Sequence, residues 1–403
     1  MNHKLDLLNP YPFEKLNALL ADVTPATNDR FIALSLGEPK HAAPDFLVEA
    51  YQNETTIRAG FGTYPPTRGI PELRSAIGGF IDRRFKLQTA IDPETQVLPV
   101  NGTREALFAF AQSVIDGKFG STTIMPNPFY QIYEGAALLA GSQPVFVPCL
   151  QATGYNPDFS VVTDEEWERC ELLYLCSPGN PTGAVMEIAA MQELIRLSDK
   201  YDFVIASDEC YSEIYASEDQ PPAGILEAAA AMGRDDFRNC IAFNSLSKRS
   251  NLPGLRSGYV AGDARIIEKF LLYRTYHGSA MSVHNQQLSV LAWQDEDHVI
   301  ANRSLYREKY RAFRDTLAGT WDMEQPVASF YLWPETPTDD ETFTRALLQQ
   351  ANIKVLPGSY LSRTVNGLNP GAGRVRMALV ATVDECVEAA TRLRDFIHAG
   401  QFA

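Results

Sequence analysis

The sequence lacks the long apolar runs and the motif spacings that mark several common classes of protein. No stretch approaches ~20 uninterrupted apolar residues, so no membrane span is expected. The six histidines show no HExxH or similar spacing, and neither a P-loop nor a GxSxG motif is present. The usual signatures of metal-dependent, P-loop and serine-hydrolase chemistry are therefore missing, and no metal ligand is predicted.

Positive charge is also scarce. The chain has 35 Lys and Arg against 50 Asp and Glu, a formal net charge of −15. An acidic surface repels nucleic acids and anionic membranes, so neither is expected as a partner, and any anion site must be local. The six cysteines form no CxxC pair, which fits a reducing cytoplasm. Asp6, Pro10 and Pro12 interrupt the apolar content of the N-terminal segment, so no signal peptide is predicted.

Length and patterning predict two domains. A chain of 403 residues exceeds what one hydrophobic core usually supports. Its middle alternates short apolar runs with longer amphipathic stretches, which predicts an α/β fold with a mostly parallel sheet covered by helices. After about Trp293 a long charged helix and short strands predict a smaller α+β domain. We expect an N-terminal arm (1–36) that joins the small domain, a large domain (37–292) and a small domain (293–403).

The apolar runs give the predicted strands, and the ends of those strands give the candidate site. The strands are expected at 96–100, 122–125, 144–147, 171–176, 203–206, 240–243 and 259–262. Helices are expected at 105–115, 188–200, 264–273 and 299–317. Ligands of open parallel sheets bind beyond the carboxyl ends of the strands, so polar residues at those positions are candidate site residues.

A lysine among hydroxyl groups follows the strand at 240–243. At this position the amine of Lys248 is expected to be partly desolvated, which makes it a nucleophile toward carbonyls. Ser245 and Ser247 precede the lysine, and Arg256 follows it with a planar set of donors suited to a phosphate. Taken alone, the segment also fits a surface loop with ordinary basic residues.

Other strand ends carry complementary groups. Gly102 and Thr103 open a helix, whose free N–H groups bind anions, although Thr103 alone also fits a simple helix cap. Asn180 lies in a turn-rich loop, where its amide either forms a turn or binds a ligand. Asp208 follows a fully apolar strand, where an ionised group needs a partner, and Tyr211 lies three residues further on.

Pyridoxal phosphate explains these groups together. The cofactor needs a lysine that reacts with its aldehyde, an acid beside its pyridine nitrogen, phosphate donors and a ring on which to stack. Asp208 is expected to be the acid, and Tyr211 and Asn180 are expected to hydrogen-bond the phenolate oxygen. Tyr130 or Phe129 offers the ring, with core packing as the alternative. The expected phosphate donors are Gly102, Thr103, Arg104, Ser245, Ser247 and Arg256.

The same motifs carry a family resemblance over essentially the whole chain. With Asn101-Gly102-Thr103, NPTG at 180–183, DECY at 208–211, SLSK ending at Lys248, and Arg256, the chain resembles fold-type I, class I/II aminotransferases. The longer strings PNPFYQIYEGAALLAG and LLYRTYHGSAM are similar to those of proteobacterial succinyldiaminopimelate transaminases, which belong to lysine and diaminopimelate biosynthesis.

The resemblance implies further roles. Arg376 would bind the substrate α-carboxylate, and the backbone of Gly37 would bind the same group. Tyr130, rather than Phe129, would stack on the cofactor, while Tyr64 would reach the phosphate of the neighbouring subunit in a homodimer. The catalytic residues would be Lys248, Asp208 and Tyr211.

The implied reaction transfers an amino group from N-succinyl-LL-2,6-diaminopimelate to 2-oxoglutarate and gives N-succinyl-2-amino-6-oxopimelate and glutamate. The alternative donors are acetylornithine, aspartate and aromatic amino acids. A substrate with further carboxylates needs a second cation. Arg274 is the candidate, either in its own subunit or across the dimer, against an ordinary helix-surface role, and Arg68 and Arg30 are weaker alternatives. The fold also hosts lyases, decarboxylases and synthases, and a non-enzymatic binding module is a further alternative.

Overall fold

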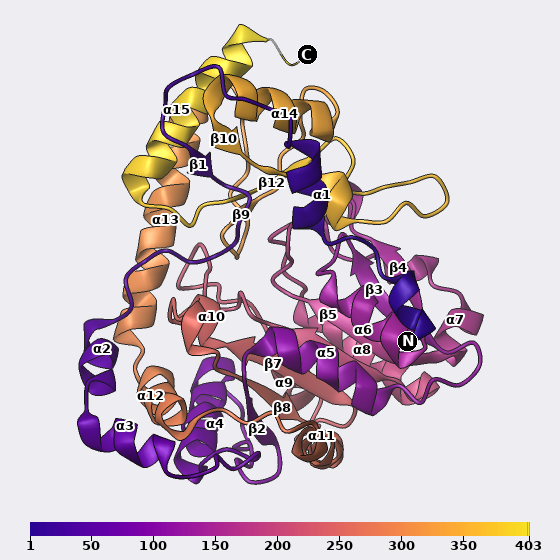
Figure 1. The fold of residues 1–403 in the computed structure, drawn as a ribbon. Helices are drawn as coiled ribbons and strands as arrows, with labels where there is room; N and C mark the ends of the chain where they lie inside the picture. The colour runs from indigo at the N-terminus through magenta and orange to yellow at the C-terminus, as the bar shows by residue number, and fades with distance from the viewer. Residues whose placement is uncertain (401, 403) are drawn as a thin grey trace.

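A large α/β part and a smaller α+β part make up the chain, and one long helix runs along both (Figure 1). This computed structural model describes residues 1–400 and 402. Over those residues the main sheet has seven strands in the order β2-β8-β7-β6-β5-β3-β4. They are β2 Val97–Val100, β3 Thr122–Asn127, β4 Gln143–Pro148, β5 Cys170–Cys176, β6 Val204–Asp208, β7 Cys240–Ser245 and β8 Gly258–Gly262. Each apolar run predicted as a strand forms one of them.

The five strands from β7 to β4 pair in parallel, while β8 is antiparallel to both β7 and β2. Every residue of β2, β3, β7 and β8 is buried, as expected for a sheet covered on both faces. The reversal at β8 follows from the short connection between β7 and β8, which holds only the helix α10 (Leu246–Arg249) and a 3-10 turn. The predicted mostly parallel α/β fold is confirmed, with these two strand pairings as its antiparallel exceptions.

Helices cover the sheet on both faces and create two cores. One face carries α5 (Thr103–Val114), α6 (Ile132–Ala140) and α11 (Ala264–His277), where Phe110 packs edge-on against Phe243 and Phe270. The other face carries a second group of helices that share one core, in which Phe80 of α4 packs against Trp293 of α12. That group is α4 Pro71–Phe85, α8 Ile188–Tyr201, α9 Ile225–Ala230 and α12 Val283–Gln294.

The smaller part has its own core and also takes in the start of the chain. Strand β1 (Ile32–Ala33) pairs in parallel with β10 (Ile353–Lys354), so the N-terminal segment packs on the C-terminal elements. A second small sheet has the antiparallel order β11-β12-β9. Its strands and the helices around it are β9 Tyr331–Leu332, β11 Leu356–Pro357, β12 Val375–Ala378, α1 Pro12–Leu19, α14 Asp340–Ala351 and α15 Val383–Ala399. The other short helices are α2 Asp45–Tyr51, α3 Glu54–Phe61 and α7 Asp164–Glu168, with 3-10 turns at His3–Leu7, Gln151–Thr153, Phe159–Val161, Pro253–Leu255 and Gly358–Leu361.

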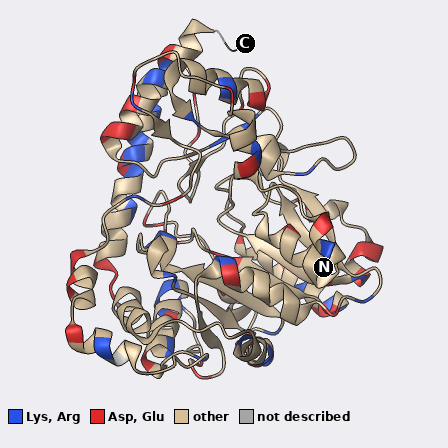
Figure 2. Cartoon of the chain, in the orientation of Figure 1, with Lys and Arg blue, Asp and Glu red and all other residues tan. Residues whose placement is uncertain are grey.

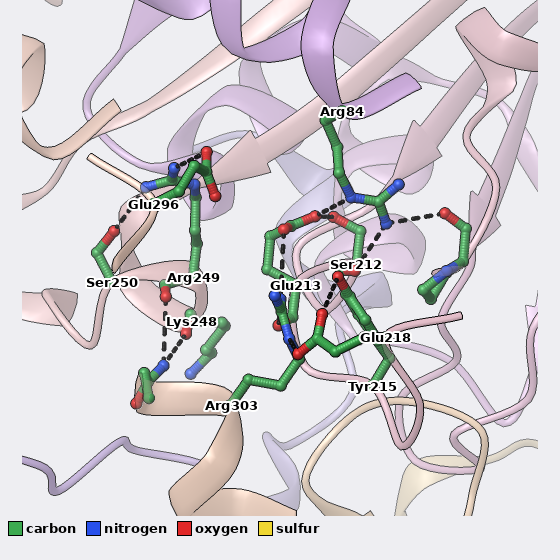
Figure 3. A network of polar contacts seen from close by, with 12 residues as sticks. Arg84, Ser212, Glu213, Tyr215, Glu218, Lys248, Arg249, Ser250, Glu296 and Arg303 are labelled. Atoms are coloured by element: carbon green, nitrogen blue, oxygen red, sulfur yellow. Dashed lines mark hydrogen bonds and ion pairs between the residues drawn. The ribbon is translucent and has the colours of Figure 1, made fainter. Parts of the chain in front are cut away.

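Helix α13 (Asp297–Leu317) ties the two parts together through a buried ionic network (Figure 3). Arg303 of α13 donates to the backbone oxygen of Glu213 at 2.9 Å and to the Glu218 carboxylate at 2.9 Å. Arg84 of α4 donates to the Glu213 carboxylate at 2.7 Å, and the Glu213 side chain is 2 % exposed. The loop after β6 is therefore fixed from both sides.

Charged residues otherwise lie mostly toward the outside of the ribbon, while the central strands are largely uncharged (Figure 2). None of the helices in residues 1–400 and 402 combines the length and apolar character needed to cross a membrane.

The network gives a stability prediction for Glu213→Gln. The change leaves Arg84 and Arg303 buried beside a neutral amide, so we expect the free energy of unfolding to fall by about 3 kcal/mol. The matched control is Glu193→Gln, because Glu193 pairs with Arg196 at 2.9 Å on the surface. Its effect should stay within about 0.5 kcal/mol. Urea unfolding followed by circular dichroism measures both; equal shifts would contradict a structural role for the network.

Candidate active site

The carboxyl ends of the central strands open into a cavity of about 540 Å³. That volume lies within the range of ~300–1,000 Å³ typical of sites for small ligands and cofactors. A neighbouring cavity of about 630 Å³ shares Tyr331 with it, but no lysine is among the residues that line that cavity. The predicted site residues that line the first cavity are Gly37, Thr103, Arg104, Tyr130, Asn180, Asp208, Tyr211, Ser245, Ser247, Lys248, Arg256 and Arg376.

Lys248 projects from the one-turn helix α10 directly after β7. The backbone carbonyl of Lys248 accepts from the Asn302 side chain at 3.2 Å, and the neighbouring Arg249 pairs with Glu296 at 2.7 Å (Figure 3). The Lys248 amine donates to the backbone oxygen of Gly37 at 2.6 Å. Burial lowers the pKa of Lys248 to about 8, and the positive charges of Arg376 and Arg256 act in the same direction. The site thus holds an amine that is partly neutral near physiological pH.

Asp208 is a buried acid that faces this cavity. It is buried at the end of β6, and its Oδ2 accepts from the hydroxyl of Tyr133 at 2.7 Å. Tyr133 in turn stacks on Tyr174 with ring centroids 4.5 Å apart. Burial raises the pKa of Asp208, and the Tyr133 hydroxyl and the Lys248 charge oppose that rise. A carboxylate in this position favours a cationic partner, such as a protonated pyridine nitrogen.

Glu209, the next residue, does not line the cavity. Its carboxylate accepts from the hydroxyl of Ser207 at 2.9 Å and from the amide of Ile225 at 2.8 Å. Burial raises the pKa of Glu209 to about 7. It therefore anchors the loop after β6.

The start of α5 and Arg256 form an anion-binding corner. Gly102 precedes the helix with φ +85°, and a Cβ atom there would lie 2.4 Å from Nη2 of Arg256. No side chain caps the helix, so Thr103 is its first residue and not a cap. The free N–H groups, the Arg256 guanidinium and the hydroxyl groups of Ser245 and Ser247 supply the donors that a phosphate needs.

Arg376 of β12 lies buried on the opposite side of the site, in the smaller part. It donates to the backbone oxygen of Ser35 at 2.7 Å and to Oδ1 of Asn180 at 3.1 Å. Its guanidinium lies 4.5 Å from the centroid of the Tyr331 ring. Its Nε is buried without a hydrogen-bond partner among the described residues, so it has donor capacity left for a carboxylate.

Two predicted residues lie elsewhere. Arg274 was expected beside the substrate, but its side chain is fully buried away from the cavity. It donates to Glu105 at 2.6 Å and to Ser279, so its charge is already neutralised and that prediction is wrong. Tyr64 is 97 % exposed and lies outside this chain's own cavity.

The weaker candidates lie elsewhere as well. Arg30 pairs with Glu388, and Arg68 donates to the backbone oxygen of Glu94. Phe129 packs in the core against Phe146, so Tyr130 is the ring that faces the cavity.

Two tyrosines that shape the site were not predicted from the sequence. Tyr133 holds Asp208, and its only sequence signal is its position three residues after Tyr130, at the start of α6. The hydroxyl of Tyr331 lies 3.1 Å from the hydroxyl of Tyr211. A Cβ atom on Gly37 would lie 1.9 Å from the Tyr331 hydroxyl. Gly37 is thus a glycine because Tyr331 packs directly against it.

The residues present fit pyridoxal phosphate. Lys248 supplies the amine, Asp208 the acid, Tyr130 the ring, and the α5 start with Arg256 the phosphate site, all around one cavity. When bound, this cofactor withdraws electrons from the Cα of an attached amino acid.

Comparisons with known proteins agree with this fit. A family model described as aminotransferase class I and II matches residues 29–393. An LL-diaminopimelate aminotransferase of Desulforudis audaxviator is 30 % identical over 391 residues, covering 96 % of this chain and 95 % of the relative.

Solved structures of other aminotransferases are also similar to this chain. An aminotransferase of Neisseria meningitidis has 46 % identity and a TM-score of 0.93, covering 99 % of this chain and 100 % of that one. The aminotransferase AspB of Helicobacter pylori has 34 % identity and a TM-score of 0.88, covering 97 % and 99 % of the two chains.

The lowered pKa of Lys248 makes a prediction for the cofactor-free protein. Only the neutral amine attacks an aldehyde, so the rate of pyridoxal phosphate capture should rise with pH through a midpoint of about 8. Removing a positive neighbour in Arg376→Gln should move the midpoint upward. Stopped-flow absorbance measures the rate, with Lys248→Ala as the control that captures no cofactor. A midpoint near the ordinary lysine value of 10.5 would contradict the desolvated site.

Proposed function

The chain belongs to the class I and II aminotransferase family, whose members depend on pyridoxal phosphate, and from this we propose that it transfers an amino group from N-succinyl-LL-2,6-diaminopimelate to 2-oxoglutarate. The products are N-succinyl-2-amino-6-oxopimelate and glutamate. This reaction belongs to the biosynthesis of diaminopimelate and lysine.

The charge of the cavity is the observation that carries the proposal. Besides Lys248, three cations line it, Arg104, Arg256 and Arg376, whereas Asp208 and Glu38 are the acids among its lining residues. One cation suffices for the cofactor phosphate and one for the substrate α-carboxylate. The succinylated donor has three carboxylates and a single ammonium group, so it matches the excess of positive charge.

LL-diaminopimelate itself is the second candidate donor, because curated relatives at 28–30 % identity carry the name LL-diaminopimelate aminotransferase. That donor has two carboxylates and two ammonium groups. A distal ammonium next to the remaining arginine is unfavourable, and succinylation removes that charge. Acetylornithine, aspartate and aromatic amino acids remain further alternatives.

Different residues of the chain have different roles in the proposed reaction. Arg376 and Asn180 would orient the α-carboxylate, while Tyr211 and Asn180 would hold the phenolate oxygen of the bound cofactor. Asp208 would face the pyridine nitrogen and favour its protonated form. Lys248, whose amine is partly neutral, would accept the proton from Cα of the substrate.

A cytoplasmic homodimer is part of the proposal. Tyr64 and Phe61 are 97 % and 78 % exposed, and Tyr276 is 88 % exposed, which leaves aromatic surface for a second copy to cover. Tyr64 would then reach the phosphate site of the partner subunit. All six cysteines are unpaired, which supports a reducing compartment.

Substrate choice is tested by a coupled glutamate assay. We expect kcat/KM for the succinylated donor to exceed that for LL-diaminopimelate, acetylornithine, aspartate and phenylalanine by about 10-fold or more, the effect of one charge-assisted contact. A larger kcat/KM for LL-diaminopimelate would replace the proposed donor by the second candidate. Consumption of the donor without glutamate formation would instead indicate a lyase or a decarboxylase.

The role of Arg376 is tested separately. Arg376→Gln should lower kcat/KM for every amino donor by about 100-fold to 1,000-fold, because a desolvated carboxylate loses its bidentate partner. Arg376→Lys should recover little, since an ammonium cannot replace the planar fork. The control is Arg374→Lys, two residues away, where the side chain pairs with Glu335 and faces the neighbouring cavity. An equal effect of Arg374→Lys would contradict the assignment.

A further inference from the structure

The cavity holds one more cation than the cofactor and the α-carboxylate require. Lys248 carries the reactive amine, Arg256 lies against Gly102 at the phosphate site, and Arg376 is directed at the α-carboxylate by Ser35 and Asn180. The remaining cation is Arg104. Arg104 is one of the predicted phosphate donors, and its guanidinium lies over the ring of Tyr11.

Arg104 is the second residue of α5, and its side chain extends over the N-terminal segment of the chain. Its guanidinium lies 5.3 Å from the centroid of the Tyr11 ring, just before α1. Both residues line the cavity, together with Gln131 and Leu36. Within residues 1–400 and 402, Arg104 donates to no acceptor and pairs with no acid, in contrast to Arg274, which Glu105 neutralises.

The charge of Arg104 acts on the cavity. Burial raises the pKa of the neighbouring Tyr130, and Arg104 is the positive charge that opposes this rise. Arg104 and Tyr130 line the same cavity, and Arg104 is also exposed to solvent. Stacking on Tyr11 uses only the face of the guanidinium, so its in-plane N–H donors remain free for a planar anion.

We propose that Arg104, oriented by Tyr11, binds the distal carboxylate of dicarboxylic substrates and sets the preference of the enzyme for them. The proposal rests on the proposed function, in which both the donor and 2-oxoglutarate carry a carboxylate beyond the one at Arg376. At the start of α5, the backbone N–H groups would bind the phosphate, and the side chain of Arg104 would bind the distal carboxylate.

Equilibrium binding to the holoenzyme tests this assignment without turnover. Glutarate and its monoamide differ only in one distal carboxylate, and isothermal titration calorimetry measures the Kd of each. Arg104→Gln should raise the Kd of glutarate by about 10-fold to 100-fold, the usual effect of losing a charge-assisted hydrogen bond. The Kd of the monoamide should rise by less than about twofold. The control Arg196→Gln, an exposed arginine on α8, should change neither.

Tyr11 provides an independent variant. Tyr11→Phe keeps the ring under the guanidinium and should retain glutarate binding, whereas Tyr11→Leu should weaken glutarate but not the monoamide. Equal weakening of both ligands by Arg104→Gln, or no weakening of either, would overturn the proposal. Loss of the visible absorbance of the cofactor from Arg104→Gln would overturn it too, because the side chain would then hold the phosphate.

The same experiments separate this inference from the identity of the donor. If the succinylated donor is not used but Arg104→Gln still discriminates between glutarate and its monoamide, the subsite is correct and only the proposed donor is wrong. If the succinylated donor is used with an unchanged KM in Arg104→Gln and glutarate binding is unchanged, the reaction stands and the subsite is wrong.

Discussion

In the cofactor-free protein, the hydrogen bond between the Lys248 amine and the Gly37 carbonyl is the contact on which the arrangement of the site depends. A buried amine needs an acceptor, and the acceptor comes from a segment 211 residues away in the chain. Strand β1 places that segment by pairing with β10, and Gly37 can approach only because it has no Cβ atom to meet Tyr331. One polar contact thus joins the lysine of the large sheet to the smaller part of the protein.

The charge of the site is opposite in sign to the net charge of the whole chain. The protein has a net charge of −15, yet four cations line one cavity. Because the phosphate, the α-carboxylate and any distal carboxylate are all anions, this local excess concentrates the ligands that the overall charge would repel. Among the described residues that line the cavity, Asp208 is the buried acid, and its hydroxyl partner Tyr133 stabilises it there without adding another charge.

Features that depend on neighbouring residues in the sequence could be predicted, whereas features that depend on contacts between distant parts of the chain could not. The strands were visible because strands buried on both faces are continuous apolar runs, and Lys248 and Asp208 were visible because they follow such runs. Tyr133 was not, since its role depends on a contact across 75 residues. Arg274 was misassigned for the same reason: its neutralising partner, Glu105, lies 169 residues away in the sequence. The contact between the Arg104 guanidinium and the Tyr11 ring likewise joins residues that are distant in sequence.

The two arginines proposed to bind the substrate differ in a way that suits their proposed tasks. Arg376 is buried, held by Ser35 and Asn180, and lies over the Tyr331 ring, so little entropy would be lost on binding the α-carboxylate common to all amino acids. Arg104 is exposed and lies over the Tyr11 ring, so it would be able to adjust to carboxylates at different distances from Cα. Two substrates of different length alternate in the proposed reaction, and only the distal end differs between them. A rigid cation for the constant group and an adaptable one for the variable group allow both substrates to react at the same lysine.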